Sequence, residues 1–274
     1  MAENYFQGTI PSELGRLLNL TYLQISENNL SGVLPPSIFN ISSLLYLDAT
    51  LNQFYGKIPQ DIGFTLPNLL GLYIGGNQFT GHLPVSLSNA SGLQECNFAL
   101  NNFTGTMLTN LGSLKDLVRL TVARNQLETD EAEGFSFLAS LTNCSNLRAL
   151  NIEGNRFQGE LPAATANFST ALQQLIVGGS NLSGSIPEGI TSLIGLTRLV
   201  IYASLITGEI PEEVGGDDDS ITMSQSKIKE CLVEVLTIGV SCSMESPRER
   251  MDMRDVVAEL CRTRTKKCPP STKE

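Results

Sequence analysis

Apolar residues recur along the chain in a fixed order, written L-x-x-L-x-L. Examples are Leu20, Leu23 and Ile25, then Leu69, Leu72 and Ile74, and later Leu147, Leu150 and Ile152. In each copy the last two apolar positions are separated by one residue, so they share one face of an extended segment. The pattern therefore predicts a series of short strands, each with one face in a core.

A second phrase, N-x-x-x-G-x-x-P in most copies, follows each of these strands, and one further copy precedes the first strand. The copies begin at Asn4, Asn28, Asn52, Asn77, Asn101, Asn125, Asn155, Ser180 and Ser204. Successive copies are 24, 24, 25, 24, 24, 30, 25 and 24 residues apart. Because one unit cannot cover its own apolar stripe, neighbouring units stack their parallel strands about 4.8 Å apart. We predict an α/β solenoid over residues 1–216, with parallel strands on its concave face.

Three residue types shape each coil. The asparagine that opens the phrase is expected to turn inward and satisfy backbone groups of the bend, and serine at Ser180 and Ser204 does this less well. Glycine permits a backbone bend, and the following proline restricts the next segment. The 30-residue unit contains extra residues, Glu128–Gly134, which we expect to loop out of the stack.

The phrase resembles the plant-specific leucine-rich repeat, N-x-L-S-G-x-I-P. The insert ends in S-L-T-N-C-S-N-L, residues 140–147, and resembles the plant immune-receptor kinase subfamily that includes receptors for bacterial flagellin and elongation-factor peptides. The resemblance implies part of a receptor ectodomain at the plasma membrane, with its repeats outside the cell. It also implies a peptide or protein ligand on the concave face and a repeat-containing co-receptor kinase as a second partner.

The repeat stops at Gly215–Ser220, and residues 217–274 are interpreted as a linker and a separate remnant. Apolar residues at helical spacing predict two short helices, within Lys227–Ser243 and Arg254–Arg264. The segments Glu230–Val233, Gly239–Met251 and Asp255–Leu260 resemble the end of the kinase domain of the same receptors. The glycine-rich loop, H-R-D and D-F-G motifs of a kinase are missing, so we expect a truncated receptor product that is not an enzyme.

Residues between the inward leucines point to the concave face and are the candidate binding residues. Tyr22, Tyr46 and Tyr73 form a contact platform in this hypothesis, and the arginines pair with acidic groups of a peptide. The alternative for any one of them is an ordinary solvated sheet surface. The full set is Tyr22, Gln24, Tyr46, Asp48, Tyr73, Asn97, Arg119, Arg124, Arg148, Asn151 and Arg198.

Charge and composition exclude several functions. The net charge is −10, and residues 1–216 carry 17 acidic and 8 basic residues, so no basic surface for nucleic acid is expected. The single histidine, His82, has no metal-ligand spacing around it, and we expect neither metal nor cofactor. The longest apolar stretch, Leu232–Cys242, is short and contains Glu234, so we expect no membrane insertion. Residues 1–8 do not resemble a secretory signal, which leaves the location of this chain open.

Eight N-x-S/T sequons suit an exported ancestor. They are Asn19, Asn29, Asn40, Asn89, Asn102, Asn143, Asn167 and Asn181. Cys96 replaces an inward leucine and Cys144 lies in a bend, so both are interpreted as apolar fillers. Three alternatives to a receptor module stay open: a secreted repeat inhibitor of a pathogen enzyme, a degenerate receptor fragment without function, and an active kinase.

Overall fold

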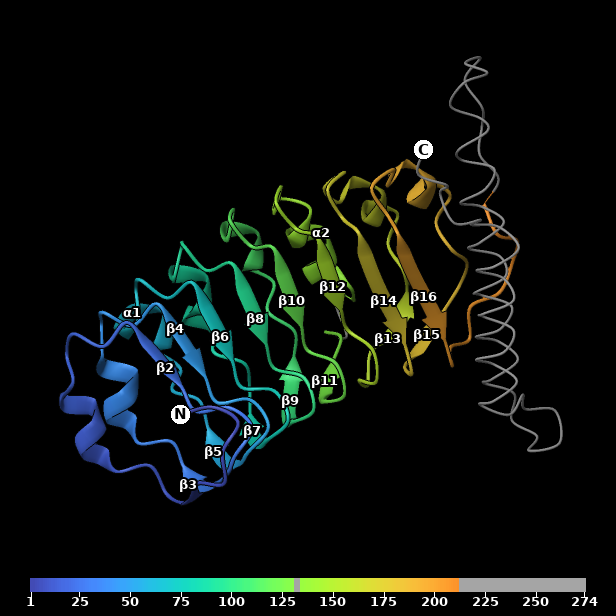
Figure 1. Ribbon diagram of the computed structural model, residues 1–274. Helices are drawn as coiled ribbons and strands as arrows, with labels where there is room; N and C mark the ends of the chain where they lie inside the picture. The colour runs from blue at the N-terminus through green and yellow to red at the C-terminus, as the bar shows by residue number, and fades with distance from the viewer. Residues whose placement is uncertain (131–133, 212–274) are drawn as a thin grey trace, which may run out of the picture.

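A computed structural model of the protein describes residues 1–130 and 134–211. Within them, parallel strands stack coil upon coil along one arc, as Figure 1 shows. The predicted linker and kinase remnant at residues 217–274, with both predicted helices, lie outside the described residues. Residues 131–133 of the insert lie outside them too.

The concave sheet has eight parallel strands, one from each L-x-x-L-x-L copy. They are β2 (Tyr22–Gln24), β4 (Tyr46–Asp48), β6 (Gly71–Tyr73), β8 (Glu95–Asn97), β10 (Arg119–Thr121), β12 (Ala149–Asn151), β14 (Gln174–Gly178) and β16 (Arg198–Tyr202). Spatial order follows chain order, because each coil contributes one strand and then returns. The predicted solenoid with parallel strands on the concave face is confirmed.

A second parallel sheet runs along the other side of the coils and was not predicted. Its strands are β1 (Gln7–Gly8), β3 (Asn29–Val33), β5 (Gln53–Lys57), β7 (Gln78–Gly81), β9 (Asn102–Thr106) and β11 (Gln126–Glu128), followed by a separate pair, β13 (Gln158–Glu160) and β15 (Asn181–Ser183). These strands form from the asparagine–glycine phrase, which the sequence analysis treats as a bend. Side chains alternate along them, so Phe54, Phe79 and Phe103 point into the core and their neighbours are exposed or partly exposed.

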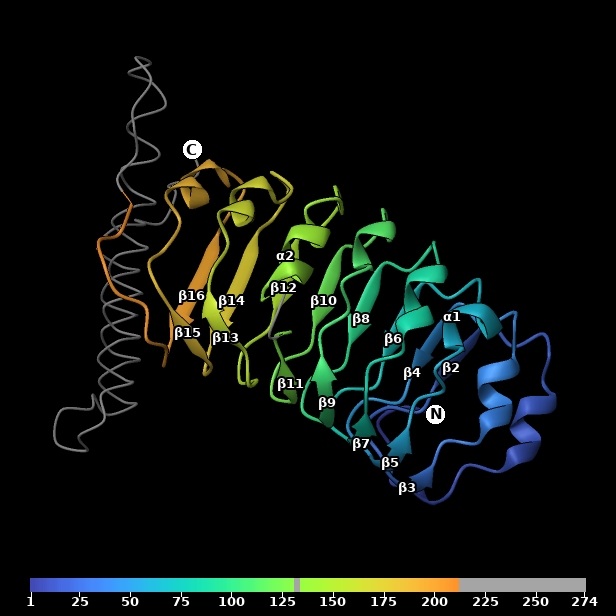
Figure 2. The same cartoon turned by 180° about the vertical axis from the view of Figure 1, so that it is seen from behind.

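Short helices form the third side of the coils, as the view from behind shows (Figure 2). The 3-10 helices are η1 (Ser12–Arg16), η2 (Pro36–Asn40), η3 (Val85–Asn89), η4 (Leu111–Ser113), η5 (Ala163–Asn167) and η6 (Glu188–Ser192), and the α-helices are α1 (Ile62–Thr65) and α2 (Ser136–Leu141). Proline is the N-cap residue of η1, η2, η3, η5 and η6, and its carbonyl accepts the first hydrogen bond of each helix. A Cβ on Gly63 would lie 1.7 Å from the Ser86 carbonyl oxygen, so α1 and η3 pack at glycine distance.

The core is a continuous stack of equivalent side chains. Phe54, Phe79 and Phe103 have ring centroids 6.5 Å and 6.4 Å apart, one ring from each successive coil. In the longer unit Phe135, Phe137 and Phe157 cluster instead, with centroids 5.4 to 5.9 Å apart. Cys96 occupies an inward leucine position and is 2% exposed, which confirms its predicted place.

Asparagine side chains join each coil to the one before it. Asn101 Nδ2 donates to the carbonyls of Phe98 (3.1 Å) and, one coil back, Ile74 (3.0 Å), while its Oδ1 accepts from the Phe79 N–H (2.9 Å). Asn52, Asn77, Asn125 and Asn155 repeat this set of bonds. We call these five asparagines, with Ser180 at the same position of its coil, the asparagine ladder. The predicted inward turn of the asparagine is confirmed.

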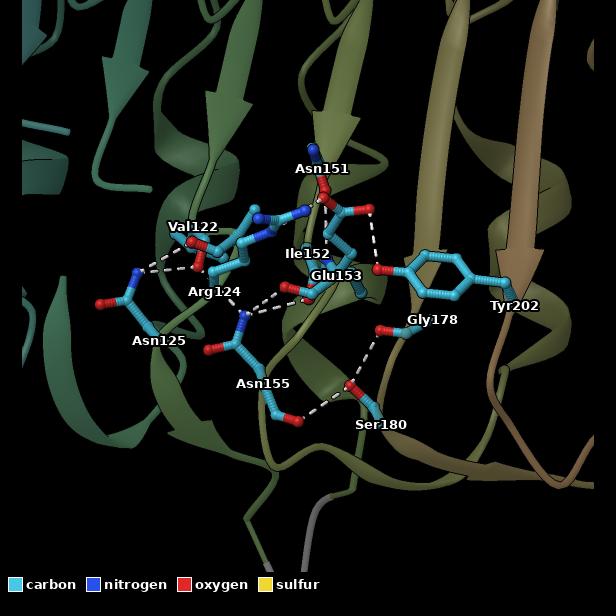
Figure 3. Close-up of polar contacts among 11 residues, drawn as sticks. Val122, Arg124, Asn125, Asn151, Ile152, Glu153, Asn155, Gly178, Ser180 and Tyr202 are labelled. Carbon is cyan, nitrogen blue, oxygen red and sulfur yellow. Dashed lines mark hydrogen bonds and ion pairs between the residues drawn. The ribbon is translucent and has the colours of Figure 1, made fainter. Parts of the chain in front are cut away.

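Ser180 makes a smaller set of bonds at the same position. Its hydroxyl donates to the carbonyls of Asn155 (3.1 Å) and Gly178 (3.3 Å), as Figure 3 shows. Serine has one donor hydrogen where the asparagine amide has two, and its side chain is shorter. The expected weakness of the coil at Ser180 therefore has a structural basis.

The residue before each ladder asparagine or serine has a left-handed backbone, which the sequence analysis missed. Glycine serves at Gly76, Gly154 and Gly179, but Leu51 and Leu100 have φ of 52° and 56°. This conformation is unfavourable for a residue with a Cβ. Arg124, with φ of 54°, belongs to the same series. It therefore lies in the turn after β10, outside the strand.

Candidate ligand-binding face

The strand register aligns the outward-facing residues of the concave strands in two columns. Tyr22 pairs with Tyr46, Tyr46 with Gly71, Gly71 with Glu95, and Glu95 with Arg119. Two residues further along each strand, Gln24, Asp48, Tyr73, Asn97, Thr121 and Asn151 align in the same way. The face therefore presents aromatic and acidic groups at its first end and arginines beyond them.

A shallow pocket opens among the first three strands, and we call it the tyrosine–aspartate pocket. Its cavity volume is about 170 Å³, and it is lined by Tyr22, Leu23, Gln24, Tyr46, Asp48 and Tyr73. The rings of Tyr22 and Tyr46 stack with centroids 4.8 Å apart and planes 14° apart. The structure thus brings five of the predicted site residues into one concavity.

Gly71 allows this arrangement of rings. A Cβ at Gly71 would lie 2.7 Å from both Tyr46 Cδ1 and Tyr73 Cε2, so the two rings close over a position without a side chain. The Tyr73 hydroxyl donates to Glu95 Oε2 at 3.0 Å. Burial raises the pKa of Tyr73 above its usual range, and Glu95 adds to the shift by its hydrogen bond and charge. Tyr73 is therefore a fixed neutral wall of the pocket.

Three polar residues of the second column hold the turn that follows their own strand. Asp48 Oδ1 accepts from the Thr50 N–H (3.0 Å), Asn97 Oδ1 from Ala99 (3.1 Å) and Asn151 Oδ1 from Glu153 (3.1 Å). This is the short-range bond by which Asp and Asn stabilise turns. Asn97 and Asn151 thus have a structural role, whatever they contact in a ligand.

The four predicted arginines do not form one group. Arg119 on β10 and Arg198 on β16 project from the sheet, and Arg148 immediately precedes β12. All three are exposed, and within the described ranges none has an ion-pair partner. Arg124 differs, because its Nε lies 3.8 Å from Glu153 Oε1 in the next turn. Its charge is already partly matched by the protein itself.

A polar contact at the far end of the face involves two residues that the sequence analysis missed. The Tyr202 hydroxyl donates to Glu153 Oε2 at 3.1 Å, and Gly178 lies between them (Figure 3). Burial raises the pKa of Tyr202, and the charge of Glu153 and its hydrogen bond add to the shift. Glu153 stands two positions before Asn155, and Tyr202 stands two positions before Ser204, at the equivalent place in its own coil.

All eight sequon asparagines are exposed, in contrast to the buried ladder asparagines Asn77, Asn101, Asn125 and Asn155. Five lie in the short helices or within three residues after them: Asn19, Asn40, Asn89, Asn143 and Asn167. The other three are the first residues of β3, β9 and β15: Asn29, Asn102 and Asn181. Asn29 also accepts a hydrogen bond from Gln53. None of the eight belongs to a strand of the concave sheet. Sugar at these positions would leave the candidate face open.

Other candidate chemistry is sparse in the part of the chain that the structure describes. Cys96 and Cys144 are free and buried, and burial raises the pKa of both thiols, which disfavours the reactive thiolate. His82 is exposed, and among the described residues no three His, Cys, Asp or Glu side chains are grouped to hold a metal ion. Across residues 1–130 and 134–211, no helix has the length and hydropathy for a membrane span.

Known proteins share the repeat and its geometry. A family model described as a leucine-rich repeat region matches residues 5–209. The receptor kinase-like protein Xa21 of Oryza sativa subsp. japonica is 39% identical over 93 residues, which is 34% of this chain and 9% of that protein. The receptor-like serine/threonine-protein kinase EFR of Arabidopsis thaliana is 38% identical over 86 residues, 31% of this chain and 8% of that protein. The matches thus span less than a tenth of these relatives.

Solved structures agree with the coil geometry. The plant peptide hormone receptor RGFR1, in complex with RGF2, superposes with a TM-score of 0.70 at 30% identity, covering 76% of this chain and 32% of that one. The Arabidopsis receptor kinase HAESA, in complex with the peptide hormone IDA and the co-receptor SERK1, gives 0.69 at 31% identity, covering 76% and 34%. Register, coil length and these matches agree, and the chain belongs to the leucine-rich-repeat family, with a fold like that of plant receptor kinase ectodomains.

Proposed function

We propose that the chain is a ligand-recognition module that binds a peptide or protein on its concave face. The observation that carries this is the continuous eight-strand sheet, whose aligned side chains include a tyrosine pocket and arginines without ion-pair partners in the described residues. Solenoids commonly bind along such a surface. RGFR1 and HAESA, which share the geometry, are both known in complexes with peptides.

The finer assignment is also a proposal. We assign the module to a plant pattern-recognition receptor kinase lineage of defence signalling, with repeats outside the cell, carbohydrate on several sequons and a co-receptor kinase as a further partner. HAESA is seen with such a co-receptor, SERK1. The similarity to EFR supports the receptor-kinase part of this assignment, and the sequon positions outside the concave sheet support a glycoprotein with an open binding face.

The binding proposal is tested by selecting random peptides on the full chain from a display library. Selected peptides are synthesised and titrated by calorimetry against the wild type, against Arg119→Glu with Arg148→Glu, and against Lys57→Glu with Lys115→Glu, two exposed positions outside the concave sheet, as a matched charge control. We expect the concave double variant to weaken binding by about tenfold or more, because charge reversal repels a complementary ligand. No enriched peptide would overturn peptide recognition, and equal losses in the control would overturn its assignment to the concave face.

Absence of kinase activity is a separate part of the proposal. It is measured as ATP-dependent phosphate transfer with magnesium, to the chain itself and to a generic protein substrate. We expect no transfer above a heat-denatured control, because the motifs that position ATP and magnesium are missing from the sequence. Transfer that denaturation abolishes would show that the chain is an enzyme.

The fold alone does not determine this function, because proteins with other functions share it. A plant ice-binding protein also superposes, with a TM-score of 0.67 at 25% identity, covering 77% of this chain and 66% of that one. Function therefore has to be argued from the face itself. A secreted inhibitor would bind a folded enzyme and would enrich no short peptide from the library, so the same selection separates the two functions.

A further inference from the structure

We propose that the tyrosine–aspartate pocket receives a basic side chain of the ligand, arginine in preference to lysine. This inference rests on the proposed function and specifies one contact within it. Three features of the pocket carry it: its charge, its aromatic walls, and an aspartate whose charge the fold itself does not use.

Among the residues that the structure describes, the first four strands of the face carry acidic residues and no basic one. Strands β2, β4, β6 and β8 contribute Asp48 and Glu95 and no lysine or arginine. Neither carboxylate forms an ion pair within the described chain. The first arginine in either column is Arg119 on β10, three strands beyond Asp48. A cation entering the pocket would therefore meet an unmatched negative charge.

The tyrosine rings, like the carboxylate of Asp48, can attract a cation. Tyr22, Tyr46 and Tyr73 line the same concavity as Asp48, so an entering group would contact the aromatic rings and the acid together. Cations are attracted to aromatic faces, and the planar guanidinium of arginine also stacks on them and forms directed bonds to a carboxylate. This combination is the reason for preferring arginine to lysine.

The charge of Asp48 is not required by its turn. Asn97 and Asn151, at the same position of later coils, make the same bond to the N–H two residues ahead, so an amide serves there equally well. The other contact of Asp48 is weak, because Gln24 Nε2 lies 3.5 Å from its Oδ2. An ionised carboxylate offers about four acceptor positions, and Asp48 therefore keeps capacity for a ligand.

The test uses the full chain with 13C-labelled tyrosine rings, observed by NMR. It is titrated with Nα-acetyl-arginine amide and, separately, with the uncharged isostere Nα-acetyl-citrulline amide. The protein has six tyrosines. Tyr22, Tyr46 and Tyr73 report on the pocket, while Tyr5, Tyr55 and Tyr202 lie outside it and serve as internal references. The same titrations are repeated on Asp48→Asn, which keeps the turn-holding acceptor.

We expect arginine amide to shift the three pocket tyrosines, and citrulline amide or Asp48→Asn to weaken this binding by about tenfold. Equal binding of citrulline, equal shifts at the reference tyrosines, or full binding by Asp48→Asn would each overturn the inference. Unchanged Tyr202 signals show that the variant is folded. If library peptides bind the concave face but arginine amide does not bind the pocket, this inference fails alone. If arginine amide binds and no peptide does, the proposed function fails instead.

Discussion

The Tyr202 hydroxyl lies 3.1 Å from Glu153 Oε2, although 49 residues separate the two in the chain. The bond spans two coils and crosses Gly178, where a Cβ would lie 2.7 Å from Tyr202 Cδ1. Most other contacts in the solenoid join adjacent coils. This one ties the last three strands of the concave sheet together.

Tyr202→Phe removes this bond and leaves the ring in place. We expect a loss of about 0.5–1.5 kcal/mol in the free energy of unfolding, the usual net value of one hydrogen bond. Hydrogen exchange should show faster opening of β14 and β16, with β4 and β6 unchanged. Tyr55→Phe, at an exposed position on β5, is the control. Uniform loss of protection along the chain would contradict a local role.

Exchanging asparagine and serine in the asparagine ladder should change the free energy of unfolding in opposite directions. Asn101→Ser loses the bonds to Ile74, Phe98 and Phe79, and we expect a cost of about 2–3 kcal/mol because buried backbone groups lose partners. Ser180→Asn should add about 1 kcal/mol by bonding the Ile152 carbonyl and the Phe157 N–H. Urea unfolding measures both, with the exposed neighbour Asn102→Ser as a control expected to change stability by less than about 0.5 kcal/mol. A destabilising Ser180→Asn would refute this account of the ladder.

Gly71→Ala should damage the pocket without touching a ligand. The new methyl group would force apart the rings of Tyr46 and Tyr73, at a cost of about 1–3 kcal/mol typical of overpacking. Altered ring signals of these two tyrosines in NMR spectra and a lower urea midpoint would report it. Gly92→Ala is the matched control, because its Cβ would contact one side-chain atom of Leu70 at 3.3 Å. Unchanged ring signals in Gly71→Ala would mean that the rings do not depend on this glycine.

The raised pKa values of Tyr73 and Tyr202 predict that the stability of the fold decreases at alkaline pH. The fold raises the pKa of both phenols, by burial first and by Glu95 and Glu153 in addition. Because the folded state holds the protonated phenol, this stabilisation is fully present below the ordinary tyrosine pKa of about 10. It is lost as the pH rises through the raised pKa of the folded state. Phenolate absorbance should show late ionisation that Tyr73→Phe and Tyr202→Phe each reduce.

The concave face could be predicted closely because the repeat spacing becomes strand register. Once Leu23, Leu47 and Leu72 are aligned in sequence, Tyr22, Tyr46 and Gly71 must lie beside one another. The 30-residue unit keeps this register, since Leu150 still pairs with Leu120. A regular repeat thus carries long-range information that an ordinary sequence lacks.

The second sheet and the cross-coil contacts could not be predicted in the same way. The asparagine–glycine phrase is rich in bend-forming residues, and its pairing depends on the neighbouring coil already being in place. Leu51 and Leu100 gave no sign of their left-handed backbone, since glycine is the residue that signals it. The contacts of Tyr202 and Arg124 depend on side-chain reach, which spacing does not encode.

The asparagine ladder also determines how the arc can change in length. Each asparagine bonds within its own coil and to the coil before it, and Asn52, Asn77, Asn101 and Asn125 do so with the same atoms. If one whole unit were removed, the asparagine of the following unit would meet the backbone groups of the preceding unit. Every hydrogen bond of the ladder would then have an equivalent. Gene duplication or loss in steps of a complete unit therefore preserves the scaffold, and shifts the tyrosines and arginines relative to each other by one strand at a time.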